Sequence, residues 1–476
     1  MHLVGAKGTG MTALAEVLAG RGFSLSGSDV PDHFYTDAIL DAIGVTMFES
    51  FDASHLDPSV DLVVHSAAYG RESNPELIAA GARGIPIMSY PEALGELSRG
   101  MDASGIAGVH GKTTTTAMCG AIVAALGIPA TVVAGSAVGA FGGRSTLRRG
   151  ERFLVAETCE YRRHFLNFHP RRIVLTSIES DHQDYYPGFE DIFAAFMEYL
   201  QLLPPGGQLV YCADDAGAAR AAMRLSDARP DLRLLGYGWR AEGPYRIESY
   251  KAHEGVADFR LAGLNHDFSL RLPGKHLALD ASAALALSFS LLGELRPDSP
   301  SAADLGLAAQ ALSAFSGSKR RSERLGEAGG VLFMDDYGHH PTAIRETLRG
   351  LREFWPARRL VVDFMSHTYT RTAALFDDFV ASLDGADLVI LHRIYASARE
   401  TAGVGQDGRQ LYEALRARRR AAGDSVEHLY FDDPLDAAEP LASLLRPGDL
   451  FLTLGAGDNW RLGLALYERL QHAENS

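Results

Sequence analysis

Short apolar runs alternate along the chain with longer stretches in which apolar residues recur at helical spacing. The runs are rich in valine, isoleucine and leucine, which is typical of strands buried in a parallel sheet. This alternation of strand and helix predicts an α/β protein. The expected strands span residues 23–29, 61–68, 85–88, 130–134, 152–157, 172–177, 208–215, 331–335, 359–363, 387–391 and 450–455.

The apolar run that begins at Gly105 leads into glycines, a lysine and threonines, and then into a helical stretch. This order predicts a phosphate-binding loop, because glycines let backbone N–H groups turn toward an anion at a helix N-terminus. Lys112 is expected to reach the terminal phosphates, and the Thr113 hydroxyl to bind Mg²⁺. The general pattern has glycine where Ile106 stands, so the loop begins at Gly108 instead. The alternative is a glycine turn before a lysine-bearing surface helix.

A second glycine-containing turn follows the first apolar residues of the chain. Gly5 and Gly10 fit the first and last glycines of a dinucleotide fingerprint, but Lys7 occupies the place of the middle one. Asp29 ends the next predicted strand, where a ribose-binding acid is expected. The pattern weakens the interpretation as a nicotinamide-dependent oxidoreductase and remains compatible with binding of a nucleotide diphosphate.

These patterns divide the chain into three segments, and 476 residues are enough for about three domains. Residues 1–98 and 316–476 are expected to form Rossmann-like domains. Residues 99–315 are expected to form a central parallel-sheet domain like that of P-loop ATPases. Within it, residues 232–272 have alternating, strand-like patches, which predict an antiparallel appendage.

Composition narrows the class of protein. Hydrophobic residues make up 46% and charged residues 22% of the chain, as in ordinary soluble globular proteins. The net charge of −15 argues against nucleic acid as a partner. The three cysteines have no metal-ligand spacing, which argues against a disulfide scaffold and fits the reducing cytosol. Without a signal-peptide pattern or a bilayer-length apolar run, we expect a cytoplasmic protein with no membrane partner.

Polar residues follow the ends of two predicted strands in the central segment. Glu157 ends one strand and His182 follows another, so both are expected to converge with Lys112 and Thr113. A kinase-like or ligase-like site needs hard oxygen ligands for Mg²⁺ beside the phosphate loop, and Glu157 is the natural candidate. Imidazole suits softer ions, so a structural, hydrogen-bonding role is the alternative for His182.

The C-terminal segment has three further polar clusters. Residues 335–341 (Asp-Asp-Tyr-Gly-His-His-Pro) follow a predicted strand and form either a metal site or a capped loop. Within residues 365–372, Arg371 is suited to grip a carboxylate in bidentate fashion, although a solvated arginine is the commoner role. The basic run 319–324 is either a solvated face or a contact to ATP phosphates.

In their joint order these motifs resemble those of the Mur ligases, the ATP-dependent amino-acid ligases of peptidoglycan synthesis. The resemblance covers nearly the whole chain, and the order of the motifs is more specific than any one of them. The matching motifs stand at residues 8–11, 26–29, 108–113, 157–160, 181–184, 273–276, 320–321, 335–341, 367–371 and 455–458.

The resemblance implies three domains that bind a UDP-sugar, ATP and an amino acid in turn, the last closing over the cleft. The implied catalytic residues are Lys112, Glu157, His182 and Arg371. The implied ligands of Mg²⁺, with Mn²⁺ as the alternative ion, are Thr113, Glu157 and His182. The implied ATP-binding residues are Gly108, Val109, His110, Gly111, Lys112, Thr113, Thr114, His276, Asp280, Arg321 and Asp336. For the UDP-sugar they are Gly8, Thr9, Gly10, Met11, Asp29, Ser66 and His182, and for the amino acid Tyr337, His339, His367 and Arg371.

Local details favour the alanine-adding branch of this family. Residues 191–200 lack the lysine that several relatives carbamylate near a second metal, and the alanine-adding branch also lacks it. The resemblance then implies UDP-N-acetylmuramate, L-alanine and ATP as substrates, joined through an acyl phosphate by a monomer or homodimer. A recycling branch that attaches a preformed peptide is the first alternative, since it shares residues 335–341 but not 367–371. A non-catalytic nucleotide-sugar binding protein is the second, and the acid Glu157 argues against it.

Four departures from the family pattern affect details of the predicted site. Leu277 and Asp280 stand where the family often has asparagines, so contacts on the adenine side are expected to differ. Ser177 replaces the usual asparagine before the Asp-His motif, and Thr368 replaces a frequent arginine. Lys7 replaces a glycine of the sugar-nucleotide turn.

Overall fold

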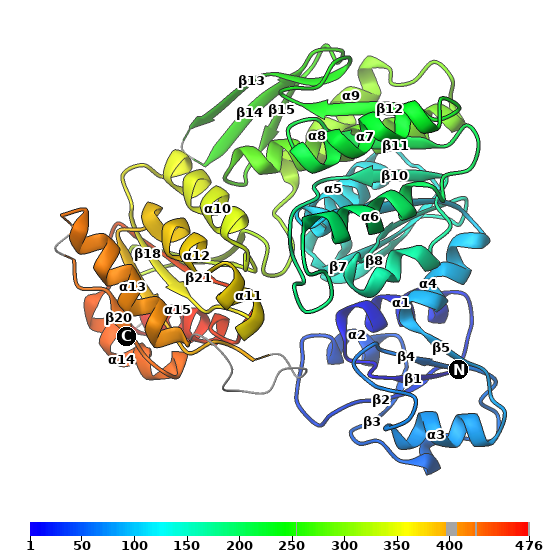
Figure 1. Cartoon of the computed structure of the whole chain (residues 1–476), viewed down its shortest axis with the longest axis horizontal. Coiled ribbons are helices and arrows are strands. Elements are labelled where there is room, and N and C mark those ends of the chain that lie inside the picture. The colour runs from blue at the N-terminus through cyan, green and yellow to red at the C-terminus, as the bar shows by residue number, and fades with distance from the viewer. Residues whose placement is uncertain (254, 397–406, 424–425, 475–476) are drawn as a thin grey trace.

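The computed structural model describes residues 1–253, 255–396, 407–423 and 426–474. It contains three separate sheets, which lie within residues 2–89, 102–270 and 323–454 (Figure 1). In this view the N-terminal sheet lies below the central one, and the C-terminal sheet stands to their left. The predicted three-part α/β architecture is confirmed, and the sheet ranges support our proposal of domain limits after residues 98 and 315.

The N-terminal domain is a parallel sheet flanked by helices. Its strands are β1 (His2–Val4), β2 (Ser26–Ser28), β3 (Thr46–Phe48), β4 (Val63–His65) and β5 (Ile87–Ser89). Its helices are α1 (Thr9–Gly20), α2 (Asp37–Ala42), α3 (Pro75–Ala82) and α4 (Tyr90–Arg99). The strand order β3-β2-β1-β4-β5 reverses direction between β1 and β4, as in Rossmann folds. Ligands of such sheets bind at the strands' carboxyl ends beside this reversal.

The central domain contains the longest sheet. Its strands are β6 (Asp102–Ala107), β7 (Ala130–Val138), β8 (Arg144–Arg148), β9 (Phe153–Glu157), β10 (Arg172–Leu175), β11 (Gln208–Cys212), β12 (Arg233–Gly238), β13 (Tyr245–His253), β14 (Val256–Leu261) and β15 (Asp267–Leu270). They run in the order β15-β14-β13-β12-β11-β10-β6-β9-β7-β8. The predicted antiparallel appendage is β13, β14 and β15, whereas β12 pairs in parallel with β11 and belongs to the main sheet.

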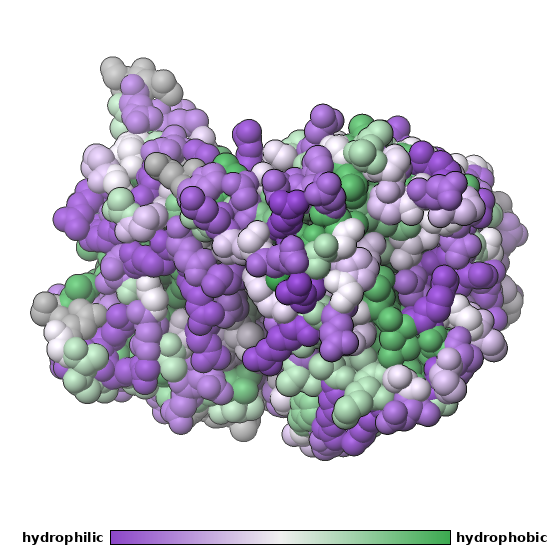
Figure 2. Space-filling model, turned by 90° about the horizontal axis from the view of Figure 1, so that it is seen from above, coloured by the Kyte–Doolittle hydropathy of each residue, from purple (hydrophilic) through white to green (hydrophobic). Residues whose placement is uncertain are grey.

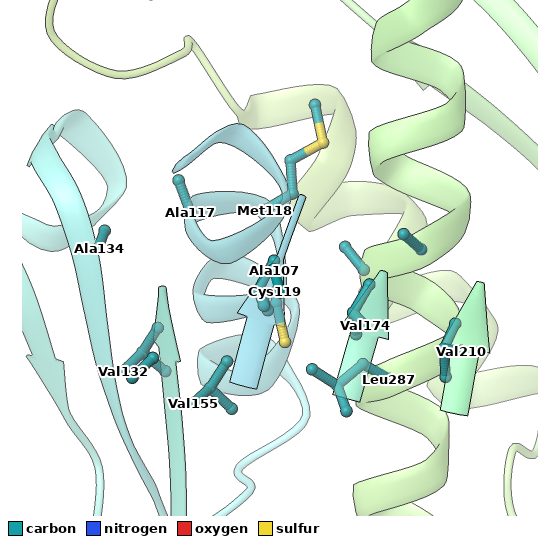
Figure 3. Close-up of a cluster of buried hydrophobic side chains, with 14 of the residues drawn as sticks. Ala107, Ala117, Met118, Cys119, Val132, Ala134, Val155, Val174, Val210 and Leu287 are labelled. Carbon is teal, nitrogen blue, oxygen red and sulfur yellow. The ribbon is translucent and has the colours of Figure 1, made fainter. Parts of the chain in front are cut away.

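Helices cover both faces of the central sheet. They are α5 (Lys112–Ala125), α6 (Phe189–Leu200), α7 (Ala216–Ala228), α8 (Lys275–Leu295) and α9 (Ala302–Ala314). Figure 3 shows α5 beside α8, and both helices pack on strands of the central sheet. Met118 and Cys119 of α5 are fully buried. Val155, Val174 and Leu287 are fully buried in this cluster. Each such side chain contributes roughly 1.5–3 kcal/mol, so packing fixes the helix that begins at the phosphate loop.

Helix α8 is long and apolar enough, by length and composition alone, to cross a membrane. However, 78% of its apolar window is buried inside the protein, and it packs against α5. It is therefore the core helix of the central domain.

Cys119 and Cys212 are also buried in this domain, Cys159 is exposed, and all three are free thiols. The face of the molecule in Figure 2 carries mainly hydrophilic residues with smaller apolar patches.

The C-terminal domain is a mostly parallel sheet. Its strands are β16 (Glu323–Ala328), β17 (Val331–Asp336), β18 (Arg359–Phe364), β19 (Leu388–Leu391), β20 (Leu429–Tyr430) and β21 (Asp449–Leu454). Its helices are α10 (Pro341–Phe354), α11 (Tyr369–Ala374), α12 (Phe376–Ser382), α13 (Gly408–Ala421), α14 (Ala438–Leu444) and α15 (Trp460–Glu474). The order is β16-β17-β21-β18-β19-β20, and only the edge strand β16 pairs antiparallel within the described sheet. The loops after β17 and β18 carry the predicted amino-acid-binding residues Tyr337, His339 and His367, and α11 carries Arg371.

Candidate active site

The phosphate loop joins β6 to α5 and requires glycine at two places. Gly108 has φ +141° and Gly111 has φ +77°, values that L side chains rarely adopt. A Cβ at Gly108 would lie 2.0 Å from Thr176 Oγ1, and a Cβ at Gly111 would lie 2.5 Å from Asp280 Oδ1. Ile106, by contrast, is a fully buried residue of β6. The loop therefore needs glycine at 108 and 111 and an apolar residue at 106.

Lys112 lies at the start of α5, inside this loop. Its Nζ donates to the carbonyl of Gly108 at 2.5 Å and to Glu160 Oε2 at 2.9 Å. Burial alone would lower the pKa of Lys112, but Glu160 and Glu157 raise it above its ordinary value. The ammonium is therefore charged at neutral pH, beside the place where phosphates are expected.

Three acidic and basic side chains meet Lys112 from other elements. Thr113 Oγ1 donates to Glu157 Oε2 at 2.8 Å, and His182 Nε2 lies 3.1 Å from Glu160 Oε1. Burial alone would raise the pKa of Glu160, but Lys112 and His182 lower it to about 2. The structure thus brings together all four residues that were expected to converge. It adds Glu160, whose only sequence signal is a second acid three positions after Glu157.

His182 adopts an uncommon backbone conformation, with φ +54°. Positive φ costs free energy for a residue with a side chain and often occurs at functional sites. Its place beside Glu160 means that, in this arrangement, the imidazole contacts a carboxylate other than Glu157. The oxygen donors for a hard cation are therefore the Thr113 hydroxyl and the Glu157 carboxylate. His182 contacts the Glu160 carboxylate instead of this pair.

Asp280, one of the departures from the family pattern, lies on α8 against the phosphate loop. It is buried, accepts a hydrogen bond from Thr115 Oγ1 at 3.2 Å, and touches Gly111. Burial raises its pKa to about 7, although Thr115 and Arg321 act in the opposite direction. Near neutral pH this carboxyl is therefore partly protonated, and its protonated form resembles the asparagine that the family often has at this position.

We expect Asp280→Asn to make folding stability less dependent on pH. The pKa of Asp280 is about 7 in the folded protein and 3.8 as its ordinary value, so folding binds a proton between these limits. This stability is complete below pH ~4 and falls by up to roughly 1.4 kcal/mol per pH unit until pH ~7. In thermal unfolding, the stability of the variant relative to the wild type should rise from pH 5 to pH 7 and stay constant above pH 7. The exposed Asp227→Asn on α7 is the control, and parallel curves for all three proteins would contradict the expectation.

The other residues expected on the adenine side differ in their burial and in their contacts. Leu277 is buried in α8 and belongs to the core. Burial lowers the pKa of His276, and its Nδ1 has no hydrogen-bond partner among the described residues. Arg321 lies over the ring of Tyr337, 4.8 Å from its centroid. The Asp336 carboxylate accepts from the backbone N–H groups of Ser322 and Gly338, each at 2.7 Å, so in this arrangement it holds its own loop together.

The predicted UDP-sugar turn lies between β1 and α1, at the sheet reversal. Asp29 accepts from the backbone N–H of Lys7 at 2.8 Å and from Tyr69 Oη at 3.0 Å. Lys7 is buried, and its Nζ donates to the carbonyl of Asp32 at 2.9 Å. The side chain of Lys7 is therefore inside the protein and stabilises the turn through this hydrogen bond. The remaining turn residues, Gly8, Thr9, Gly10 and Met11, open α1, and Ser66 follows β4 at the same sheet edge.

The predicted amino-acid-binding residues lie in the loops after β17 and β18 and, for Arg371, in the helix α11. Arg371 Nε donates to Asp181 Oδ1 of the central domain at 2.9 Å, and its Nη1 lies 3.3 Å from His367 Nδ1. The ring of His339 lies 6.2 Å from that of His367 and 5.2 Å from that of Tyr337. Burial would raise the pKa of Asp181, but Arg371 holds it well below its usual range. The arginine expected to grip a ligand carboxylate thus already grips a protein carboxylate across the domain boundary.

Three family models match the chain in order. They are described as Mur ligase family, catalytic domain, at residues 1–101, Mur ligase middle domain, at 106–288, and Mur ligase, glutamate ligase domain, at 320–457. Among curated relatives, the UDP-N-acetylmuramate–L-alanine ligase of Treponema pallidum is 49% identical over 471 residues, 98% of this chain and 96% of the relative. The ligase of the same name from Borrelia garinii is 38% identical over 466 residues, 97% of each chain.

Solved structures show the same architecture. The crystal structure of the UDP-N-acetylmuramate-alanine ligase from Thermotoga maritima has a TM-score of 0.77 at 23% identity and covers 99% of each chain. A murein peptide ligase from Psychrobacter arcticus has a TM-score of 0.65 at 23% identity and covers 98% of each chain. At these identities the likeness describes the fold alone.

Proposed function

Because the chain belongs to the Mur ligase family, we propose that it joins L-alanine to the carboxylate of UDP-N-acetylmuramate in an ATP-dependent reaction of peptidoglycan precursor synthesis. The observation that carries this proposal is that the phosphate-loop residues Lys112 and Thr113 lie together with Glu157. In addition, Arg371 of the C-terminal domain bonds the central domain. The activity named for the full-length relatives supplies the two substrates.

In the first step, the muramic acid carboxylate attacks the γ-phosphate of ATP and gives an acyl phosphate and ADP. A carboxylate is a poor acylating agent, and phosphorylation gives it a leaving group. Two anions must approach each other, so the charged Lys112 lowers the barrier by electrostatic stabilisation. Positioning and electrostatics supply most of the catalysis in such phosphoryl transfers.

In the second step, the amine of L-alanine attacks the acyl phosphate, and phosphate leaves from the tetrahedral intermediate. Arg371 is the proposed partner of the alanine carboxylate, with His339, His367 and Tyr337 around it. Arg371 then shares its guanidinium between alanine and Asp181, which a five-donor group permits. Closure of the domains keeps water away from the acyl phosphate.

Mg²⁺ is the proposed metal, with Mn²⁺ as the alternative. The Thr113 hydroxyl and the Glu157 carboxylate fit a hard cation, because both are oxygen donors and they lie 2.8 Å apart beside Lys112. A metal bound there supplies neutralisation of the phosphate charge. His182 remains a proposed third ligand, and its partner Glu160 fixes the imidazole beside Lys112.

We further propose that the protein acts in the cytoplasm on small molecules, as a monomer or homodimer, without a nucleic-acid or membrane partner. The net charge of −15 and the absence of cysteine pairing support this setting.

Phosphate release tests the proposed reaction. With ATP, Mg²⁺ and UDP-N-acetylmuramate, we expect release that depends on added L-alanine. L-serine, glycine and a tripeptide serve as matched acceptors in the same assay. Release with the tripeptide but not with L-alanine would move the protein to the peptide-recycling branch. Binding of ATP and the UDP-sugar without release for any acceptor would indicate a non-catalytic binding protein.

A further inference from the structure

A second cluster of metal-type ligands lies beside the phosphate loop, and the proposed reaction assigns no metal to it. His110 belongs to the phosphate loop, Glu179 to the loop after β10, and His340 to the turn that starts α10. One ligand atom from each lies within 4.8 Å of the others. His110 Nε2 is 3.4 Å and His340 Nδ1 is 3.6 Å from the same oxygen, Glu179 Oε2.

The charge states of Glu179 and His340 suit a divalent cation. Burial would raise the pKa of Glu179, but His110 and His340 lower it to about 2, so the carboxylate is ionised at neutral pH. Burial, followed by the nearby His110, lowers the pKa of His340 to about 4, so its imidazole is neutral. His340 Nε2 is buried and has no hydrogen-bond partner within the part of the chain that the structure describes. A carboxylate and neutral imidazoles are ordinary donors for Zn²⁺ and Co²⁺.

Hydrogen bonds hold the three ligands in place. The backbone N–H of His110 donates to Ser177 Oγ at 2.9 Å, which fixes the loop that carries this histidine. His340 Nδ1 accepts from Thr342 N at 3.3 Å, and an ion bound at Nδ1 would take the place of this hydrogen bond. Thr342 Oγ1 donates to Glu179 Oε2 at 2.9 Å. Outer hydrogen bonds of this kind orient metal ligands and are typical of built sites.

We propose that His110, Glu179 and His340 form a binding site for a transition-metal ion such as Zn²⁺, and that the ion ties the central domain to the C-terminal domain. Two ligands come from the central domain and one from the C-terminal domain. Two histidines and one carboxylate leave further coordination positions open. This site is separate from the Mg²⁺ ligands proposed at Thr113 and Glu157. A bound ion stabilises the closed arrangement and slows the opening that substrate exchange requires.

Co²⁺ titration of the whole, substrate-free protein tests the site by visible absorption, with Zn²⁺ as competitor. We expect one Co²⁺ to bind and Zn²⁺ to displace it. His340→Asn keeps a helix-capping acceptor for Thr342 N but removes the imidazole, and should weaken Co²⁺ binding by at least about tenfold. His182→Ala is the matched control, because it removes a histidine from the Mg²⁺ region and leaves the cluster intact. Equal Co²⁺ binding by wild type and His340→Asn, or none by either, would overturn the site.

Glu179→Gln provides a second variant if His340→Asn fails to fold, since the amide can still accept from Thr342. Small-angle scattering then tests the link between domains. Zn²⁺ should reduce the radius of gyration of the wild type but not of the variant. Binding without compaction would overturn the proposed tie while supporting the site. Neither measurement uses a substrate, so failure here is distinguishable from failure of the proposed ligase reaction.

Discussion

Replacing Lys112 by alanine is expected to lower turnover by roughly 10²–10³-fold or more, as for loss of one preorganised charge-stabilising group, while binding of UDP-N-acetylmuramate stays nearly unchanged. Lys112 supplies the cation between two reacting anions, and its ammonium is held 2.9 Å from Glu160. Removing it leaves Glu160 buried beside His182 alone, so negative charge next to the phosphates increases. The UDP-sugar turn belongs to another domain and keeps its own contacts.

Phosphate release and calorimetric titration with UDP-N-acetylmuramate measure the two halves of this expectation. Lys251→Ala, an exposed lysine of β13, is the matched control and should behave like the wild type. The double variant Lys112→Ala with Glu160→Gln separates two roles of the lysine. If Lys112 only neutralised Glu160, the double variant would regain activity. Unchanged turnover in Lys112→Ala would contradict the proposed catalytic role of Lys112.

Replacing Arg371 by alanine is expected to raise the KM for L-alanine by roughly 10²-fold or more. Arg371 and Asp181 are both buried, and their bond crosses the domain boundary. Truncating one partner of such a pair costs about 3–5 kcal/mol, or roughly 10²–10⁴-fold. In Arg371→Ala, the alanine carboxylate loses its proposed partner and Asp181 is left unpaired in the closed arrangement.

Initial rates over a wide range of L-alanine concentrations test this expectation. The loss should be large at low alanine and smaller at saturation, since the missing contact is to the amino acid. Arg349→Ala, an exposed arginine of α10, is the control. Asp181→Asn removes the protein partner but keeps Arg371, so its effect on the KM for L-alanine should be smaller. An equal loss at low and saturating alanine would contradict direct binding of the carboxylate by Arg371.

The strand positions and the phosphate loop were predictable from the sequence because their signals are local. Each apolar run expected as a strand overlaps an observed strand, and Gly108 and Gly111 stand where the backbone needs positive φ. The edge strand β16 was missed, because its residues alternate poorly between buried and exposed. The insertion of β21 between β17 and β18 was also missed, because sheet order depends on packing between distant segments.

The site was predictable as a set of residues but not as a set of contacts. Glu160 acquires its role only by pairing with Lys112 and His182, which come from separate elements. Sequence reasoning gave Arg371 a ligand carboxylate as partner, and it did not foresee the bond to Asp181, 190 residues away. Lys7 was interpreted as a residue that replaces a glycine in a ligand-binding turn. The sequence did not show that its side chain is buried and bonds the carbonyl of Asp32. Periodicity and spacing carry no information about such pairings.

The distance along the chain between Asp181 and Arg371 has a consequence for synthesis on the ribosome. A ribosome that adds about 5–20 residues per second takes roughly 10–40 s to pass from Asp181 to Arg371, since 190 positions separate them. The central domain can fold in that interval, but the carboxylate of Asp181 must stay hydrated until its arginine emerges. The nascent central domain therefore passes through a stage in which the future domain interface is wet and negatively charged. Docking of the C-terminal domain, which is made after the central domain, completes the interface.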